Sequence, residues 1–158
     1  MKDLAKSFVY AFNGIIVCIK KERNMRIHLT FCAYMFYFLG VHDWFEVTRT
    51  QYAILFVICA AVIGGELVNT AIERAVDHAS TEITEPGRIA KDCAAGAVLV
   101  SAVFAVACGI AILWQPDAFR AMFAYYKEHL YFLAILIVCV TLSVIFIFKG
   151  IPGGKKDK

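Results

Sequence analysis

The chain has 158 residues and a formal net charge of +3; 61% of the residues are hydrophobic and only 18% are charged. With a mean hydropathy of +0.69, it is too apolar and too poor in charge for an ordinary soluble domain of this length. We therefore expect an all-α integral membrane helical bundle, with membrane lipids and not nucleic acid as its surroundings and partners.

The N-terminal segment, residues 1–28, predicts an amphipathic helix on the membrane surface. Its apolar residues recur at helical spacing while Lys2, Lys6 and Lys20 lie elsewhere around the helix. The alternative is a helix packed against another protein chain. The segment lacks a small-residue cleavage site, so we expect no cleavable signal peptide.

The first candidate span covers residues 27–41 and is short, but a helix extended back to Arg23 is long enough to cross a bilayer. Arginine side chains at its start can reach the head groups. The polar loop that follows contains Trp44 and Phe45, residues typical of a membrane interface.

The second span starts near Tyr52 and runs into a polar stripe of Glu66, Asn69, Glu73 and Asp77. Offsets of 3, 7 and 11 residues fall on one face of an α-helix. Carboxylates that follow an apolar run usually face a bundle interior and serve a function. The alternatives are a polar contact between helices or a solvated helix end.

The rest of the chain predicts two further spans. Residues 78–91 contain Pro86 and Gly87 and predict an exposed loop. An uncharged third span covers residues 93–114, and residues 115–129 form an outer loop or an interfacial helix. A fourth span covers residues 130–148 and precedes a basic tail, residues 149–158.

Positive charge orients this arrangement. With a cytoplasmic N-terminus, residues 1–26, 74–91 and 149–158 lie inside and hold thirteen of the sixteen Lys and Arg residues. An excess of Lys and Arg in cytoplasmic segments is the general rule. We therefore expect a multi-pass protein of the bacterial inner membrane with the polar stripe at its cytoplasmic face.

The cysteines and histidines indicate no metal or disulfide framework. Six cysteines are scattered without a CxxC pair, and most lie in apolar runs, where they are small core residues. The four histidines are expected at membrane interfaces.

Four carboxylates, Glu22, Glu66, Glu73 and Asp92, are expected to meet at the cytoplasmic face, with Lys91 and Arg26 beside them. Such a group fits a divalent cation and a phosphorylated ligand, because Mg²⁺ takes one or two carboxylates together with phosphate oxygens. No P-loop or kinase glycine loop is present. On these residues alone, a small proton- or ion-coupled transporter and a non-catalytic membrane scaffold remain alternatives.

The segment GGELVNTAIERAVDHAS, followed by AKDCAAGAVL, closely resembles the signature of the prokaryotic diacylglycerol kinase and undecaprenol kinase family. KKERNMRIH resembles the first acidic segment of that family, with Glu22 and Arg26 in register. The resemblance covers about residues 3–114. It implies a homotrimeric membrane lipid kinase with a surface helix and three spans per subunit, so we expect a kinase domain at residues 1–114 and an addition at residues 115–158.

The resemblance also implies roles for individual residues. Glu66 matches the general base and Asn69 a polar residue near the transferred phosphate. Glu22 and Glu73 match the carboxylates that hold Mg²⁺ with ATP, the phosphoryl donor. The resemblance further implies contacts to ATP from these residues: Tyr10, Glu22, Glu73, Asp77, Glu82, Lys91 and Asp92.

Two points depart from or refine the resemblance. The shortest members lack the fourth span, whose few polar side chains predict that it takes no direct part in catalysis. The ERNMRIH form and the lysine-rich first helix are more similar to the undecaprenol kinase branch, so undecaprenol is the favoured acceptor and diacylglycerol the alternative.

Overall fold

The computed structural model describes residues 2–80 and 82–151. The helices in this part of the chain are α1 (Lys2–Lys21), α2 (Arg23–Val41), α3 (Arg49–Ala79), α4 (Glu85–Leu113), α5 (Pro116–Glu128) and α6 (Leu130–Lys149). The expected basic tail lies largely outside the described residues, including its last three lysines, Lys155, Lys156 and Lys158.

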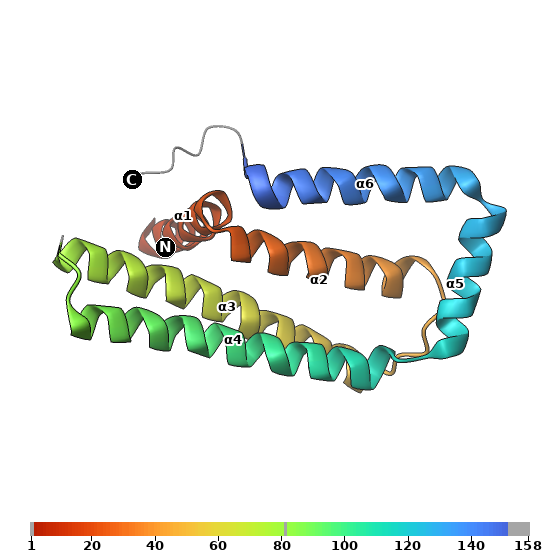
Figure 1. The fold of residues 1–158 in the computed structure, drawn as a ribbon, viewed down its shortest axis with the longest axis horizontal. Helices are drawn as coiled ribbons and strands as arrows, with labels where there is room; N and C mark the ends of the chain where they lie inside the picture. Colours follow the sequence, from red (N-terminus) through yellow and green to blue (C-terminus); the bar gives the residue numbers. More distant parts are fainter. Residues whose placement is uncertain (1, 81, 152–158) are drawn as a thin grey trace.

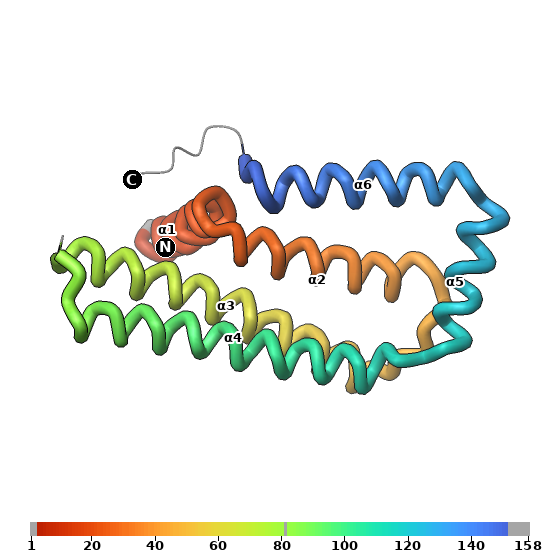
Figure 2. The backbone as a smooth tube through the Cα atoms, viewed as in Figure 1, coloured from red at the N-terminus to blue at the C-terminus, as the bar shows by residue number. Residues whose placement is uncertain are grey.

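α2, α3, α4 and α6 run alongside one another, and α1 and α5 cross them (Figure 1). α3 and α4 form an antiparallel hairpin, α2 lies against α3, and α6 lies on the far side of α2. The backbone trace in Figure 2 shows α1 crossing one end of this layer, while α5 joins α4 to α6 at the other end. The end of α6, the α3–α4 connection and α1 therefore lie at the same end of the molecule.

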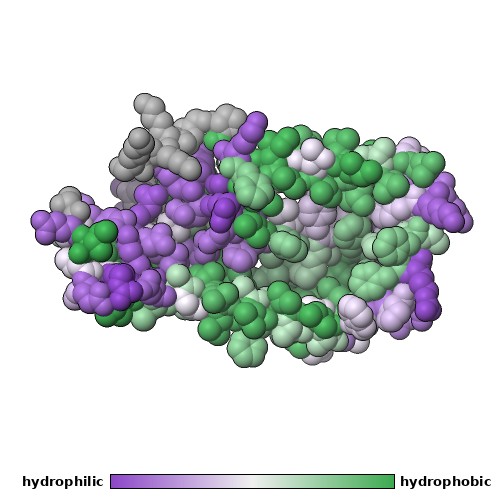
Figure 3. Space-filling view, viewed as in Figure 1, coloured by the Kyte–Doolittle hydropathy of each residue, from purple (hydrophilic) through white to green (hydrophobic). Residues whose placement is uncertain are grey.

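Three helices, α3, α4 and α6, are long and apolar enough to cross a membrane. Figure 3 shows a largely apolar middle between two more polar ends, as a bilayer requires. α2 is not among the three, since Arg23, Arg26 and His28 in its first two turns lower its hydropathy. At 19 residues α2 is about 28 Å long, and its crossing of the membrane stays a prediction.

α1 is the amphipathic helix that the sequence predicts, and its C-terminal turn joins the core. Its apolar side chains Leu4, Phe8 and Phe12 remain exposed, as expected of a helix lying on a membrane surface. By contrast, Cys18 is 1% exposed. The most fully buried side chains, Cys18, Met25, Leu55 and Glu66, come from α1, α2 and α3, so the core lies where these helices meet.

The predicted loop over residues 78–91 is wrong in its second half. The break covers only residues 80–84, and α4 begins at Glu85. Thr84 caps the helix by accepting a hydrogen bond from the Gly87 amide, and Pro86 lies in the first turn. Proline there gives up an amide that has no helical partner, so Pro86 and Gly87 mark a helix start and not a loop.

The end of the molecule opposite α1 carries a helix where residues 115–129 were expected to form an outer loop or an interfacial helix. α5 begins at a proline in its first turn and packs aromatic rings against the α2–α3 loop. The ring of Trp44 stacks on His42 with centroids 3.9 Å apart and meets Tyr125 edge-on at 5.4 Å. Aromatic side chains of this kind are typical of membrane interfaces.

Candidate active site

Three members of the polar stripe on α3 line one cavity of about 280 Å³. Glu66, Asn69 and Glu73 contribute its polar wall, because their spacing places them on one helix face. α2 and α4 close the cavity with Asn24, Ile27, His28, Ala95, Val98, Leu99 and Ala102. These three residues thus face the space between α2, α3 and α4, whereas Asp77, the last member of the stripe, is exposed at the solvated end of the helix.

Glu66 is the most deeply buried ionisable group of the stripe. Its side chain is 2% exposed, and its carboxyl lies within electrostatic range of the carboxyls of Glu22 and Glu73. Burying a carboxyl beside two others destabilises a fold unless a cation or a proton compensates it. The arrangement therefore fits a site that binds a cation or exchanges a proton.

Asn69 lies between Glu66 and Glu73 on the stripe and binds the second of them. Its Nδ2 donates a hydrogen bond of 3.0 Å to Glu73 Oε1, which fixes both side chains. Its Oδ1 is buried and has no hydrogen-bond partner among residues 2–80 and 82–151. A buried acceptor without a donor is costly, so Asn69 Oδ1 is available to a bound group that brings a donor or a cation.

The corner between α1 and α2 contacts α3 next to this cavity, through Cys18 and Thr70. Cys18 Sγ and Thr70 Oγ1 are 3.2 Å apart, and Thr70 Oγ1 donates to the backbone oxygen of Glu66. Burial raises the pKa of the Cys18 thiol, an effect partly offset by the hydrogen bond with Thr70. Glu22 follows this turn at once, and its amide donates to Cys18 O at 2.8 Å. The corner thereby holds Glu22 near Glu66.

The remaining predicted site residues do not line the cavity. Asp77 is exposed and accepts a hydrogen bond from Lys91 Nζ, which joins α3 to α4 above the site. Asp92 faces Arg88, whose guanidinium donates to it at 2.8 Å and also binds Glu85. Because α4 begins earlier than expected, Lys91 and Asp92 occupy its second turn.

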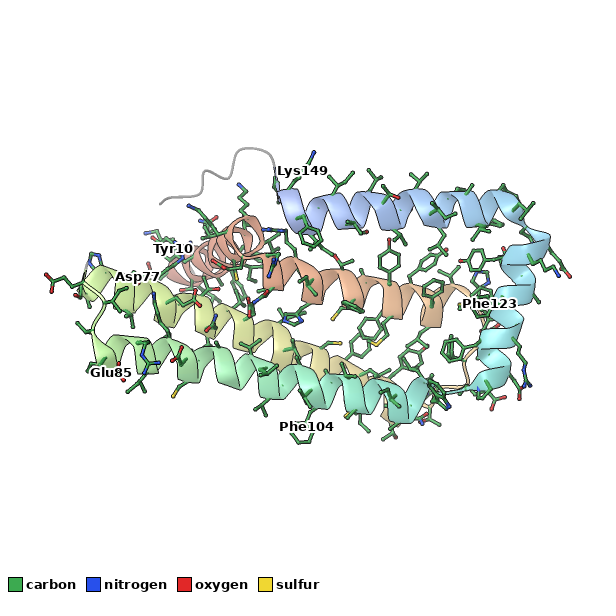
Figure 4. All side chains as sticks on the ribbon, viewed as in Figure 1. Tyr10, Asp77, Glu85, Phe104, Phe123 and Lys149 are labelled. Atoms are coloured by element: carbon green, nitrogen blue, oxygen red, sulfur yellow. The ribbon has the colours of Figure 1, made fainter. Side chains whose placement is uncertain are left out.

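Tyr10 and Glu82 lie at the same end of the molecule but away from the cavity wall. Tyr10 is 71% exposed on α1, and Glu82 is exposed in the α3–α4 connection, where its amide binds Ser80 Oγ. Figure 4 shows the labelled Tyr10 and Asp77 at the end where α1 crosses the bundle. The structure brings Glu66, Asn69 and Glu73 together on the cavity wall and places Glu22 within electrostatic range of Glu66, but not on that wall. It leaves these predicted site residues outside the cavity: Tyr10, Asp77, Glu82, Lys91 and Asp92.

No complete protein metal site is formed. In the part of the chain that the structure describes, no three His, Cys, Asp or Glu side chains are grouped closely enough to hold a metal ion.

Three residues of the site escaped the sequence analysis. Asn24 and His28 line the cavity from α2, and Thr70 supports it from below. Asn24 and His28 are four residues apart and so share one helix face. This signal was overlooked because the first span was expected to begin near residue 27. Histidine at the start of a span is also typical of an interface, which is how His28 was interpreted.

Comparison with known proteins agrees with the site. Residues 9–113 match the family model for prokaryotic diacylglycerol kinase. The chain is 36% identical to the diacylglycerol kinase of Synechocystis over 115 residues, 72% of this chain and 64% of that protein. It is 36% identical to the undecaprenol kinase of Bacillus subtilis over 108 residues, 68% of this chain and 85% of that protein.

The match thus spans less than two thirds of the Synechocystis relative, and α5 and α6 lie beyond the family match. No solved structure matches the chain significantly. The cavity residues Glu66, Asn69 and Glu73 all lie within the matched region. The chain belongs to the prokaryotic diacylglycerol kinase family.

Proposed function

We propose that the chain transfers the γ-phosphate of ATP to the hydroxyl group of a membrane lipid. One observation carries this proposal: a buried carboxyl, Glu66, lines a cavity beside a second carboxyl and an unpartnered amide oxygen, between helices of a membrane bundle. Membership of a lipid kinase family supports the same activity. Both a lipid hydroxyl from the bilayer and ATP from the aqueous side can approach such a site.

Glu66 is the general base in this proposal. Its carboxylate accepts the proton of the lipid hydroxyl as the hydroxyl oxygen attacks the γ-phosphorus, and the bond from that phosphorus to the β–γ bridging oxygen breaks. ADP is the leaving group. Val98 and Leu99 of α4 make this side of the cavity apolar, which favours the lipid over water as the attacking group.

Glu22 and Glu73 are proposed to hold Mg²⁺ together with the phosphates of ATP. The residues fit this ion, because two carboxyls lie near Glu66 and the buried Asn69 Oδ1 lacks a donor. Bound Mg²⁺ neutralises charge on the phosphates during transfer. The hydrogen bond from Asn69 to Glu73 keeps that carboxylate oriented toward the cavity.

The nucleotide is proposed to extend from the cavity toward α1 and the α3–α4 connection. Lys91, held by Asp77, is placed to donate to a phosphate. Tyr10, Glu82 and Asp92 are exposed polar groups at the same end, and we keep them as proposed nucleotide contacts. A homotrimer, with this end at the cytoplasmic face of the bacterial inner membrane, completes the proposal.

Undecaprenol is the proposed acceptor, and diacylglycerol is the alternative. Relatives named for each acceptor are equally identical to this chain, at 36%, so the ERNMRIH segment at the α1–α2 corner carries the preference. The test is a competition assay in mixed micelles with both alcohols present at equal mole fraction. Faster phosphorylation of undecaprenol supports the proposal, and faster phosphorylation of diacylglycerol overturns this choice of acceptor.

A further inference from the structure

Arg26, on α2, binds two other helices, α1 and α6, through its guanidinium. Its Nη1 donates to the backbone oxygens of Ile19 at 3.0 Å and Lys20 at 3.2 Å, at the end of α1. Its Nε donates to the backbone oxygen of Ile147 at 3.0 Å, near the end of α6. Arg26 itself is on α2 and is 5% exposed, so these contacts replace its hydration.

The hydrogen-bond acceptors of Arg26 are backbone carbonyls in the last turns of α1 and α6. The last carbonyls of a helix have no partner within the helix and carry the negative end of its dipole. α1 and α6 end next to each other at Arg26, and a single guanidinium with five donors serves both. Gly150, directly after α6, adopts a φ of +71°, and a Cβ built there would lie 3.4 Å from Arg26 Cζ. The end of α6 therefore turns tightly around this side chain.

The α1 carbonyls that Arg26 binds belong to the corner that holds Glu22. Ile19 and Lys20 are followed within three residues by Glu22, which occupies the position before the first residue of α2. The Cys18 side of the same turn contacts Thr70 and, through it, the backbone of Glu66. A guanidinium that fixes this turn therefore fixes the backbone of Glu22 relative to α3, which carries Glu66.

We propose that Arg26 is a positioning residue that clamps the ends of α1 and α6 together, so that α6, a helix beyond the family match, braces Glu22 in the active site. The proposal rests on the proposed function, in which Glu22 binds Mg²⁺ with ATP. A second contact joins α6 to α2 farther along the two helices: the hydroxyl oxygens of Tyr34 and Ser143 are 2.9 Å apart. α6 thus acts on the site through its backbone, even though its own side chains lie outside it.

The first experiment removes the guanidinium in the full-length protein. Arg26→Gln is expected to raise the KM for Mg·ATP about tenfold, because a displaced Glu22 would lose the equivalent of one charge-assisted contact to the Mg·ATP complex, with a smaller change in kcat. Arg26→Lys keeps the charge but not the planar fork and should restore part of the loss. Arg120→Gln is the matched control, because the Arg120 side chain is 80% exposed and its ion pair, with Asp117, lies on α5 away from the clamp. An unchanged KM in folded Arg26→Gln overturns the proposal.

The second experiment perturbs the clamp from the α6 side. Gly150→Ala strains a positive φ and presses a methyl group on the guanidinium. Gly40→Ala is its control, because a Cβ at Gly40 meets nothing within 4 Å. Gly150→Ala should raise the KM for Mg·ATP in the same direction as Arg26→Gln, and Gly40→Ala should not. If the two glycine variants have the same KM for Mg·ATP, the end of α6 does not act on the site, and the proposal is overturned.

A readout without catalysis separates the clamp from the proposed activity. Cys18 is buried in the clamped turn, and its neutral thiol reacts slowly. The rate of Cys18 alkylation is measured by peptide mass spectrometry. It should rise about tenfold in Arg26→Gln and should also rise in Gly150→Ala, while the thermal midpoint of each variant stays near that of the parent protein. If the parent protein phosphorylates no lipid, the proposed function fails, and the alkylation rates still decide the clamp. Alkylation rates equal to the parent's overturn the clamp.

Discussion

Glu66→Gln tests the base at the centre of the proposed reaction. The amide has nearly the volume of the carboxyl it replaces, and no hydrogen bond of the Glu66 side chain to another described residue is lost. The substitution removes negative charge beside Glu22 and Glu73, so folding should be preserved. Loss of a general base lowers a rate by about 10²–10⁴-fold, and we expect kcat to fall by that factor.

The assay is initial-rate phosphorylation in mixed micelles at saturating Mg·ATP, with the thermal midpoint and the oligomeric state measured on the same samples. The KM for Mg·ATP should change little, because Glu66 acts on the lipid hydroxyl. Glu128→Gln, at an exposed position on α5, is the matched control and should match the parent. A near-normal kcat in folded Glu66→Gln would refute the assignment of Glu66 as base.

The remaining predictions concern the metal, the nucleotide and α6. Glu22→Ala and Glu73→Ala should each raise the Mg²⁺ concentration needed for half-maximal rate, without loss of oligomer; an unchanged Mg²⁺ titration contradicts this role. Lys91→Ala should raise the KM for ATP about tenfold, since one charge-assisted hydrogen bond to a phosphate is lost, and equal nucleotide saturation curves for variant and parent would exclude the contact. Truncation after Gln115 should leave phosphorylation measurable with a higher KM for Mg·ATP, whereas a folded truncated oligomer without any activity would give α6 a direct catalytic part.

The sequence predicts most of the fold because each helix carries a local signal. The amphipathic spacing of α1, the apolar runs of α3, α4 and α6, and the aromatic residues of α5 each specify an element without knowledge of its neighbours. The start of α4 was missed because proline and glycine are also the commonest loop residues. Only the capping hydrogen bond of Thr84 distinguishes the two cases.

The site was predictable where one helix supplies it and less so where several helices meet. Glu66, Asn69 and Glu73 share a face of α3, so periodicity alone places them together. The contributions of Asn24 and His28 depend on how α2 rotates against α3, which no local pattern fixes. The contact of Arg26 with the end of α6 is still harder to predict from the sequence, because the backbone carbonyls that accept its hydrogen bonds are more than a hundred residues apart.

The central claim is that this chain phosphorylates a lipid hydroxyl, and one measurement tests it most directly. Purified protein is incubated with Mg²⁺, ATP labelled in the γ-phosphate and a lipid alcohol in mixed micelles, and both the labelled lipid and ADP are quantified. The account predicts that labelled phospholipid and ADP form in equal amounts and that Glu66→Gln abolishes nearly all of both. ADP formation without labelled lipid, or labelled lipid at the same rate in Glu66→Gln, would contradict it.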